Sequence, residues 1–195
     1  MNKTLLLLLS LSLFGCQDFD ARDSQNTTVK QIDKPIVEEI EWNTIKVRNF
    51  KFDLPSNMQL QLAQSNDRKK TYVDEKKSLG LTIDIELLPS GYEFVESVSE
   101  LVPDIKVFGE EINKNNRKTF SDFILASTDY AILGNNSSIL VRQVSTQISG
   151  KSIPMYINTY FVVTSPYYCT FTFSYPMSSE LGYDNFTRII KSFIF

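Results

Sequence analysis

The stretch YYCTFTFSYP, from Tyr167 to Pro176, has the clearest strand pattern in the chain. One face would carry Tyr167, Cys169, Phe171, Phe173 and Tyr175, and the other would carry Tyr168, Thr170, Thr172 and Ser174. Successive side chains of a β-strand point to opposite faces, so the alternation predicts a strand with one aromatic and one mainly hydroxylic face. The segments around this strand indicate what it pairs with.

Similar period-two patterns, separated by turn signals, recur along the chain. They predict strands at Ile45–Leu54, Met58–Leu62, Lys70–Asp74, Leu79–Leu88, Phe120–Ala126, Tyr130–Leu133, Ile139–Ile148 and Ile153–Val163. The third and fourth of these form a predicted hairpin. Strands joined by short turns predict an antiparallel sheet.

Two segments have helical spacing instead. Between Gly91 and Pro103 the apolar residues recur at three and four, which predicts one helix, followed by a charged loop through Arg117. Near the C-terminus Ser178 or Ser179 can cap a helix with Tyr183, Phe186, Ile189, Ile190 and Phe193 on one side. The sequence therefore predicts an α+β fold, an antiparallel β-sheet flanked by helices.

The N-terminal segment, residues 1–15, has the pattern of an export signal. Lys3 precedes a leucine-rich block from Leu5 to Phe14. Ten such residues make about 15 Å of helix, half of a bilayer core of about 30 Å, so the block is too short to span a membrane. A charged start and a short apolar centre are typical of a secretory signal peptide.

The signal ends in Leu13-Phe14-Gly15-Cys16, which resembles the lipobox of bacterial lipoproteins. This resemblance implies cleavage before Cys16 and lipidation of its thiol, so that several acyl chains anchor the protein to a membrane without spanning it. A chance cysteine behind an ordinary signal is the alternative. Residues 16–43 are then a flexible acidic tether and residues 44–195 the globular domain.

The residues CQDFD, from Cys16 to Asp20, resemble the acidic signals that send Bacteroidota-type lipoproteins to the outer face of the outer membrane. The start of an acidic linker is the alternative. We therefore expect a lipid-anchored protein of the bacterial outer membrane, on its periplasmic or cell-surface side.

Composition argues against several classes of function. The chain has no histidine, the commonest general base and transition-metal ligand, and we expect no enzyme activity, metal or cofactor. Its formal net charge is −3 and no segment forms a dominant basic patch, which argues against nucleic acid as a partner. Cys169 is predicted to be a buried structural thiol, and Asp84 and Glu86 to lie on a solvated strand face.

Three tyrosines, Tyr156, Tyr160 and Tyr168, fall on the faces opposite the more apolar faces of their strands. If a helix covers that side of the sheet, they belong to the core. If no helix does, they form an aromatic patch of the kind that binds protein partners. They are the candidate partner-binding residues.

The segments FKFDLP (Phe50–Pro55), YYCTFTFSYP (Tyr167–Pro176) and NFTRIIKSFIF (Asn185–Phe195) resemble the PsbP-like group, which includes DcrB-type periplasmic lipoproteins. The likeness extends from Ile45 to Phe195. It implies a PsbP-like α/β/α sandwich and a non-enzymatic accessory or protein-binding role with an envelope protein as partner. A ligand-binding or toxin-neutralising, immunity-type lipoprotein is the alternative.

Overall fold

The structure is a computed structural model that describes residues 40–74, 79–119, 122–146 and 153–195. Seven strands form one antiparallel sheet in the order β3-β4-β5-β9-β8-β7-β6. In chain order their bounds are β3 Gln59–Leu60, β4 Lys69–Asp74, β5 Leu79–Leu87, β6 Ile124–Leu133, β7 Asn136–Ser145, β8 Met155–Thr164 and β9 Tyr167–Pro176. The predicted α+β fold with an antiparallel sheet is confirmed.

Strand β9, the aromatic stretch, lies in the middle of this sheet between β5 and β8. Cys169 stands opposite Ile85 of β5 and Val162 of β8. Directly opposite residues of antiparallel strands share a face, so the aromatic face of β9 continues into the apolar faces of its neighbours. Phe171 and Phe173 are fully buried in the resulting core.

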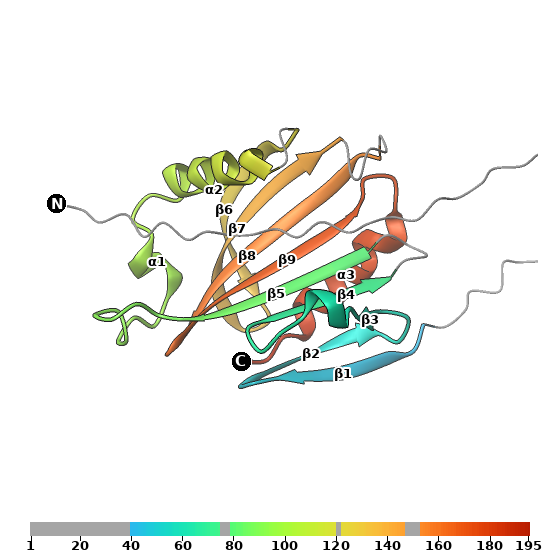
Figure 1. Ribbon diagram of the computed structural model, residues 1–195, viewed down its shortest axis with the longest axis horizontal. Helices are drawn as coiled ribbons and strands as arrows, with labels where there is room; N and C mark the ends of the chain where they lie inside the picture. The colour runs from blue at the N-terminus through green and yellow to red at the C-terminus, as the bar shows by residue number, and fades with distance from the viewer. Residues whose placement is uncertain (1–39, 75–78, 120–121, 147–152) are drawn as a thin grey trace, which may run out of the picture.

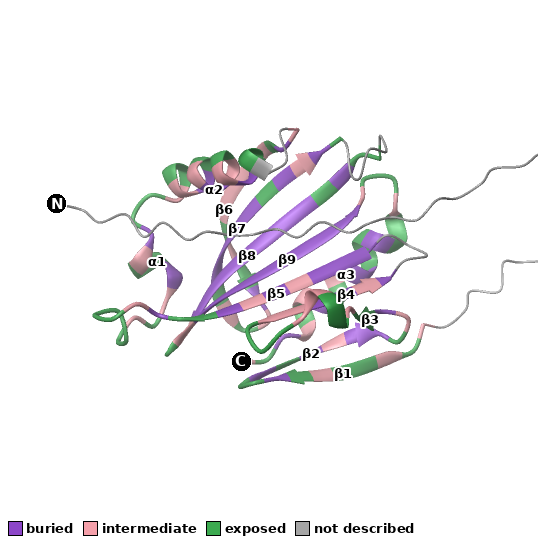
Figure 2. Cartoon of the chain, viewed as in Figure 1, coloured by how far each residue is buried: buried purple, intermediate pink, exposed green. Residues whose placement is uncertain are grey.

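Helix α3 (Glu180–Ser192) covers the aromatic face, together with the separate hairpin of β1 (Trp42–Val47) and β2 (Phe50–Pro55). The core on this side includes Phe50, Phe52, Leu81, Ile83, Phe171, Phe173, Phe186, Ile189 and Phe193. Helices α1 (Val98–Leu101) and α2 (Ile105–Thr119) lie on the opposite face, near β6 to β8 (Figure 1). The sheet therefore has a core on each face, and its central strands are the most continuously buried (Figure 2).

The predicted single strand from Ile45 to Leu54 is wrong, because the chain turns back at Arg48 and Asn49. Arg48 adopts a φ of +50°, and Val47 pairs with Phe50 across the turn. A non-glycine residue in this region is uncommon, so an arginine at this position gives no signal of a turn. Tertiary contacts stabilise the turn, since Arg48 donates a hydrogen bond to the hydroxyl of Tyr167 (3.1 Å) and lies 5.0 Å from the centre of its ring.

The predicted charged loop through Arg117 is also wrong, because most of it forms helix α2. Asp104 begins this helix: its Oδ1 accepts hydrogen bonds from the backbone N–H groups of Lys106 (2.9 Å) and Val107 (3.2 Å). The predicted helix between Gly91 and Pro103 shortens to the four residues of α1. The longer helix on this side of the sheet therefore follows Pro103 instead of preceding it.

Smaller differences concern strand ends. The two strands predicted at Phe120–Ala126 and Tyr130–Leu133 are one strand, β6, with a bulge between Leu125 and Ser127. The strand predicted at Met58–Leu62 is reduced to β3, followed by the short 3-10 helix η1 (Leu62–Gln64). The C-terminal helix is confirmed with Ser179 as its cap, whose Oγ accepts a hydrogen bond from the N–H of Gly182 (2.9 Å).

Residues 1–39, which include Cys16 and nearly all of the predicted tether, lie outside the described residues. Within the part of the chain that is described, no helix is long and apolar enough to cross a bilayer.

Candidate partner-binding surface

The three candidate tyrosines do not lie together. Tyr156 and Tyr160 of β8 stand opposite Tyr175 and Phe171, on the face that α3 covers. Tyr168 stands opposite Val163 and belongs to the core of the other face. The single patch of three tyrosines is therefore wrong as a geometry.

Burial separates them further. Tyr160 packs against Phe186 of α3 and is buried, and Tyr168 is buried against Phe161. Tyr156 keeps 36% of its surface exposed. The alternative in which the tyrosines belong to the core thus describes Tyr160 and Tyr168, whereas Tyr156 remains available to a partner.

Around Tyr156 the strand register builds two rows of side chains on the α3 face. The outer row contains Ile124, Val144, Tyr156 and Tyr175, one from each of β6, β7, β8 and β9. The next row contains Ser127, Arg142 and Asn158. The Nδ2 of Asn158 donates a hydrogen bond to the hydroxyl of Tyr175 (3.3 Å), which links the two rows.

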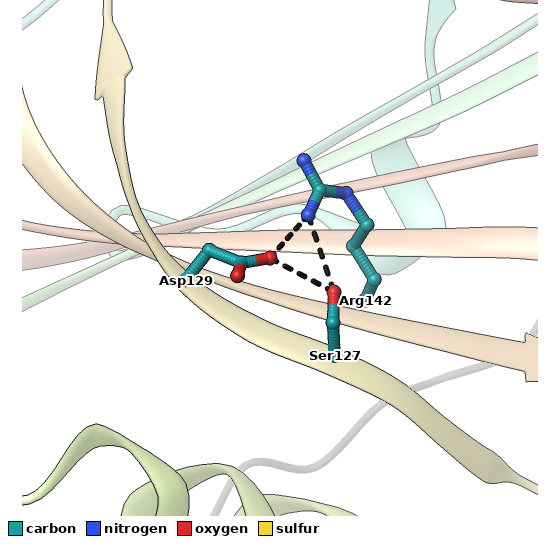
Figure 3. Close-up of polar contacts among 3 residues, drawn as sticks. All are labelled: Ser127, Asp129 and Arg142. Carbon is teal, nitrogen blue, oxygen red and sulfur yellow. Dashed lines mark hydrogen bonds and ion pairs between the residues drawn. The ribbon is translucent and has the colours of Figure 1, made fainter.

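Arg142 of β7 and Asp129 of β6 form an ion pair at the edge of these rows (Figure 3). The Nη1 of Arg142 donates to Asp129 Oδ2 and to Ser127 Oγ (3.2 Å), and Ser127 Oγ donates to Asp129 Oδ2 (2.9 Å). These contacts all use Nη1 and Oδ2. Among the described residues, Arg142 Nη2 and Asp129 Oδ1 have no hydrogen-bond partner. Both side chains are nearly half exposed, so these atoms can be reached from solvent.

Helix α3 adds Tyr183, which lies near Tyr160 and Tyr175 and whose ring is 6.4 Å from that of Phe186. Its exposed fraction is 57%, and that of Ile124 is 60%. We name these surface residues the tyrosine–arginine patch; they are Ile124, Asp129, Arg142, Val144, Tyr156 and Tyr183. The patch is partly apolar, with one ion pair in which Arg142 Nη2 and Asp129 Oδ1 have no partner among the described residues.

Tyr160 and Tyr175 lie beneath the patch, and both are uncharged at neutral pH. Burial raises the pKa of Tyr160 to about 12, although the nearby Arg142 opposes that rise. Burial also raises the pKa of Tyr175, and the hydrogen bond from Asn158 opposes it. Both hydroxyls therefore stay protonated near pH 7, and neither can act as a base there.

The other candidate groups show no catalytic arrangement. Cys169 is completely buried, as predicted, and burial raises the pKa of its thiol to about 12. Asp84 and Glu86 share a strand face; burial is the main cause of the raised pKa of Asp84, Lys69 opposes it and Glu86 adds to it. Among the described residues, no group of three or more His, Cys, Asp or Glu side chains could hold a metal ion.

Sequence reasoning missed an open pocket of about 780 Å³ between α2 and the start of β6. Its lining includes Glu110, Lys114 and Arg117 from α2, and Asp122 and Leu125 before and within β6. The signal for α2 was present, since Asp104 can cap a helix and apolar residues follow at spacings of three and four. The two acids and two bases among these residues favour neither an anionic nor a cationic ligand.

No protein-family model and no curated protein matches the sequence. Solved structures do match the fold. The cyanobacterial PsbP (CyanoP) of Synechocystis sp. PCC 6803 matches with a TM-score of 0.60 at 11% identity, covering 85% of this chain and 97% of that one. The Ran-binding protein Mog1p of Saccharomyces cerevisiae matches with a TM-score of 0.50 at 8% identity, covering 80% and 96%. The chain therefore has the PsbP/Mog1-like fold.

Proposed function

We propose that this protein is a lipid-anchored envelope protein whose folded domain binds a protein partner through the tyrosine–arginine patch and catalyses no reaction. The observation that carries the proposal is the patch itself. It places exposed Tyr156 one row from Arg142, whose Nη2 has no described partner, and exposed Tyr183 near the same buried residues, Tyr160 and Tyr175.

The composition of the patch matches that of residues that dominate protein–protein binding. Tyrosine and arginine are enriched at such positions because each combines a large contact area with directional hydrogen bonds. Tyr156 packs on Tyr175, with ring centres 5.6 Å apart, so it is already partly held before a partner arrives. A side chain that is ordered in advance loses less entropy on binding.

The lack of histidine in the whole sequence and the raised pKa values of Tyr160, Tyr175 and Cys169 support a non-enzymatic role. The fold adds support of a general kind. Mog1p, which shares it, is a Ran-binding protein, so this architecture serves protein binding in at least one other case. At 8% identity that likeness does not extend to the partner.

The anchor rests on the sequence alone, since Cys16 lies outside the described residues. Labelling cells with a palmitate analogue tests it. The wild-type chain should incorporate the label and a Cys16→Ala variant should not; equal labelling of the two would contradict lipidation at this residue. Protease treatment of intact cells then separates a surface position, where the domain is cleaved, from a periplasmic one, where it survives.

Partner binding is tested by crosslinking cells and purifying the tagged protein with its complex. Tyr183→Ala and Arg142→Glu should lower recovery of the partner at least tenfold. Tyr92→Ala is the matched control, since Tyr92 is 43% exposed and lies outside the patch. Equal recovery with all three variants would reject the patch as the binding surface.

The same experiment addresses the alternative. A resident envelope protein in the complex supports the accessory role, whereas a secreted effector supports a toxin-neutralising one. These substitutions should leave the domain folded, since Tyr183 is exposed and exposed ion pairs such as Asp129–Arg142 contribute about 1 kcal/mol or less to stability. Thermal unfolding of each variant verifies that the domain is intact.

A further inference from the structure

Strand β6 forms one edge of the seven-stranded sheet. Its inner side pairs with β7, and within the described residues no strand pairs with its outer side. Beyond the bulge at Leu125, the stretch Ser127–Leu133 pairs with β7 without interruption. It therefore presents a regular row of backbone N–H and C=O groups on its outer side.

The two edges of the sheet differ in how they are protected. The other edge, β3, has two residues and runs into a 3-10 helix, so it offers little backbone to a further strand. Edges are usually protected by lysine, proline, bulges, short length or a covering helix. Helix α2 contacts β6 at Thr128, but Tyr130 and Ile132 beyond that residue remain exposed. The stretch Ser127–Leu133 has no lysine and no proline, and its one charged residue, Asp129, is paired with Arg142.

The side chains along this edge are apolar on one face. Tyr130 and Ile132 stand opposite Ile139 and Ser137 on the face that carries α2, and their exposed fractions are 60% and 69%. On the other face Asp129 belongs to the tyrosine–arginine patch. The edge is thus continuous with the proposed binding surface.

We propose that the partner adds an extended segment to the outer side of β6 as a further strand of the sheet. Main-chain hydrogen bonds to an edge strand supply affinity in this mode, and alternate side chains supply specificity. The complementary segment is low in charge, because the Asp129–Arg142 pair is itself neutral. It carries β-branched or aromatic side chains beside Tyr130 and Ile132, and a hydrogen-bond donor beside Asp129 Oδ1.

This inference rests on the proposed function, because the same partner would cover the patch and the edge. A single added strand buries little surface, and a stable protein interface usually needs about 1,200 Å² or more. Contact with Tyr156, Tyr183 and Arg142 supplies the rest. Asp129, which belongs to both surfaces, connects them.

The test uses the full chain in intact cells, with the photo-crosslinking residue p-benzoylphenylalanine placed singly at Tyr130, Ile132, Tyr183 and Leu62. Leu62 is the control, since it is 79% exposed beside the opposite edge. The first three positions should capture one protein, and Leu62 should not. The partner residues crosslinked from positions 130 and 132 should lie two apart in one continuous segment, as strand pairing requires.

Each other outcome is decisive. Crosslinks from position 183 without any from 130 or 132 would reject strand addition and leave the proposed function standing. Partner residues scattered over several segments would also reject strand addition. The absence of crosslinks from all three positions would reject both proposals. Ile132→Lys, which places a charge on the edge, should lower partner recovery at least tenfold, whereas Leu62→Lys should not.

Discussion

Gly109 of α2 lies directly against Thr128 of β6. A Cβ atom built on Gly109 would stand 1.8 Å from the Oγ1 of Thr128 and 2.9 Å from its Cβ. No real pair of atoms approaches this closely without a bond, so the absence of a side chain at position 109 allows the helix to sit at its present depth. This contact seats α2 against the face of β6 that carries Thr128.

Gly109→Ala should therefore destabilise the domain by about 1–3 kcal/mol, the usual cost of overpacking, even though alanine favours a helix by about 1 kcal/mol. Urea unfolding measures the change. The double variant with Thr128→Ala should recover part of the loss, because the nearest atom, Oγ1, is then gone. Unchanged stability of the single variant would contradict the close contact.

Stability should fall in alkali. Burial raises the pKa of Cys169 from 9.0 to about 12 and that of Tyr160 from 10.0 to about 12. The folded state holds these protons more tightly. Their contribution to the free energy of unfolding is therefore complete below the pKa values of the unfolded chain and is lost as pH rises toward 12. Each group contributes a slope of up to about 1.4 kcal/mol per pH unit in that window.

The measurement is the free energy of unfolding between pH 8 and 11. Cys169→Ala should reduce the slope between pH 9 and 10, where the thiol titrates in the unfolded chain and tyrosine contributes little. Tyr160→Phe should reduce it above pH 10. Slopes that match the wild type in both variants would show that neither group is responsible.

Arg188 of α3 places its guanidinium 3.9 Å from the centre of the Trp42 ring in β1. Removing this contact by Arg188→Ala should cost about 0.5–1 kcal/mol, the usual range for an exposed cation–π pair. Trp42 is the only tryptophan, so its fluorescence reports the change directly, with emission shifted toward that of solvated indole. Lys191→Ala, at an exposed position of the same helix, should leave the spectrum unchanged.

The elements that the sequence predicted well have local signals. Period-two alternation located β4, β5, β7, β8 and β9 to within a few residues, and Ser179 marked the start of α3. The elements that it missed depend on distant contacts. The turn at Arg48 contacts Tyr167, more than a hundred residues away, and this stabilising contact cannot be read from the segment Ile45–Leu54 itself.

The candidate site was predicted only in part. Tyr156 was identified from the alternation within β8, and it does lie in the patch. Tyr168 was grouped with it wrongly, because the face of one strand was matched to the face of another without knowledge of their register. Asp129, Arg142 and Tyr183 were missed for the same reason, since each is unremarkable within its own segment.

The sequence by itself determined which side chains of each strand share a face, because alternation is a property of the extended backbone. It also determined that the whole chain lacks histidine. Only the tertiary structure decided that Val163 stands opposite Tyr168 and Tyr175 opposite Tyr156, which places Tyr156 and Tyr168 on different faces of the sheet. Register and helix placement depend on contacts between residues far apart in the chain, and these also bring Arg142 beside the tyrosines.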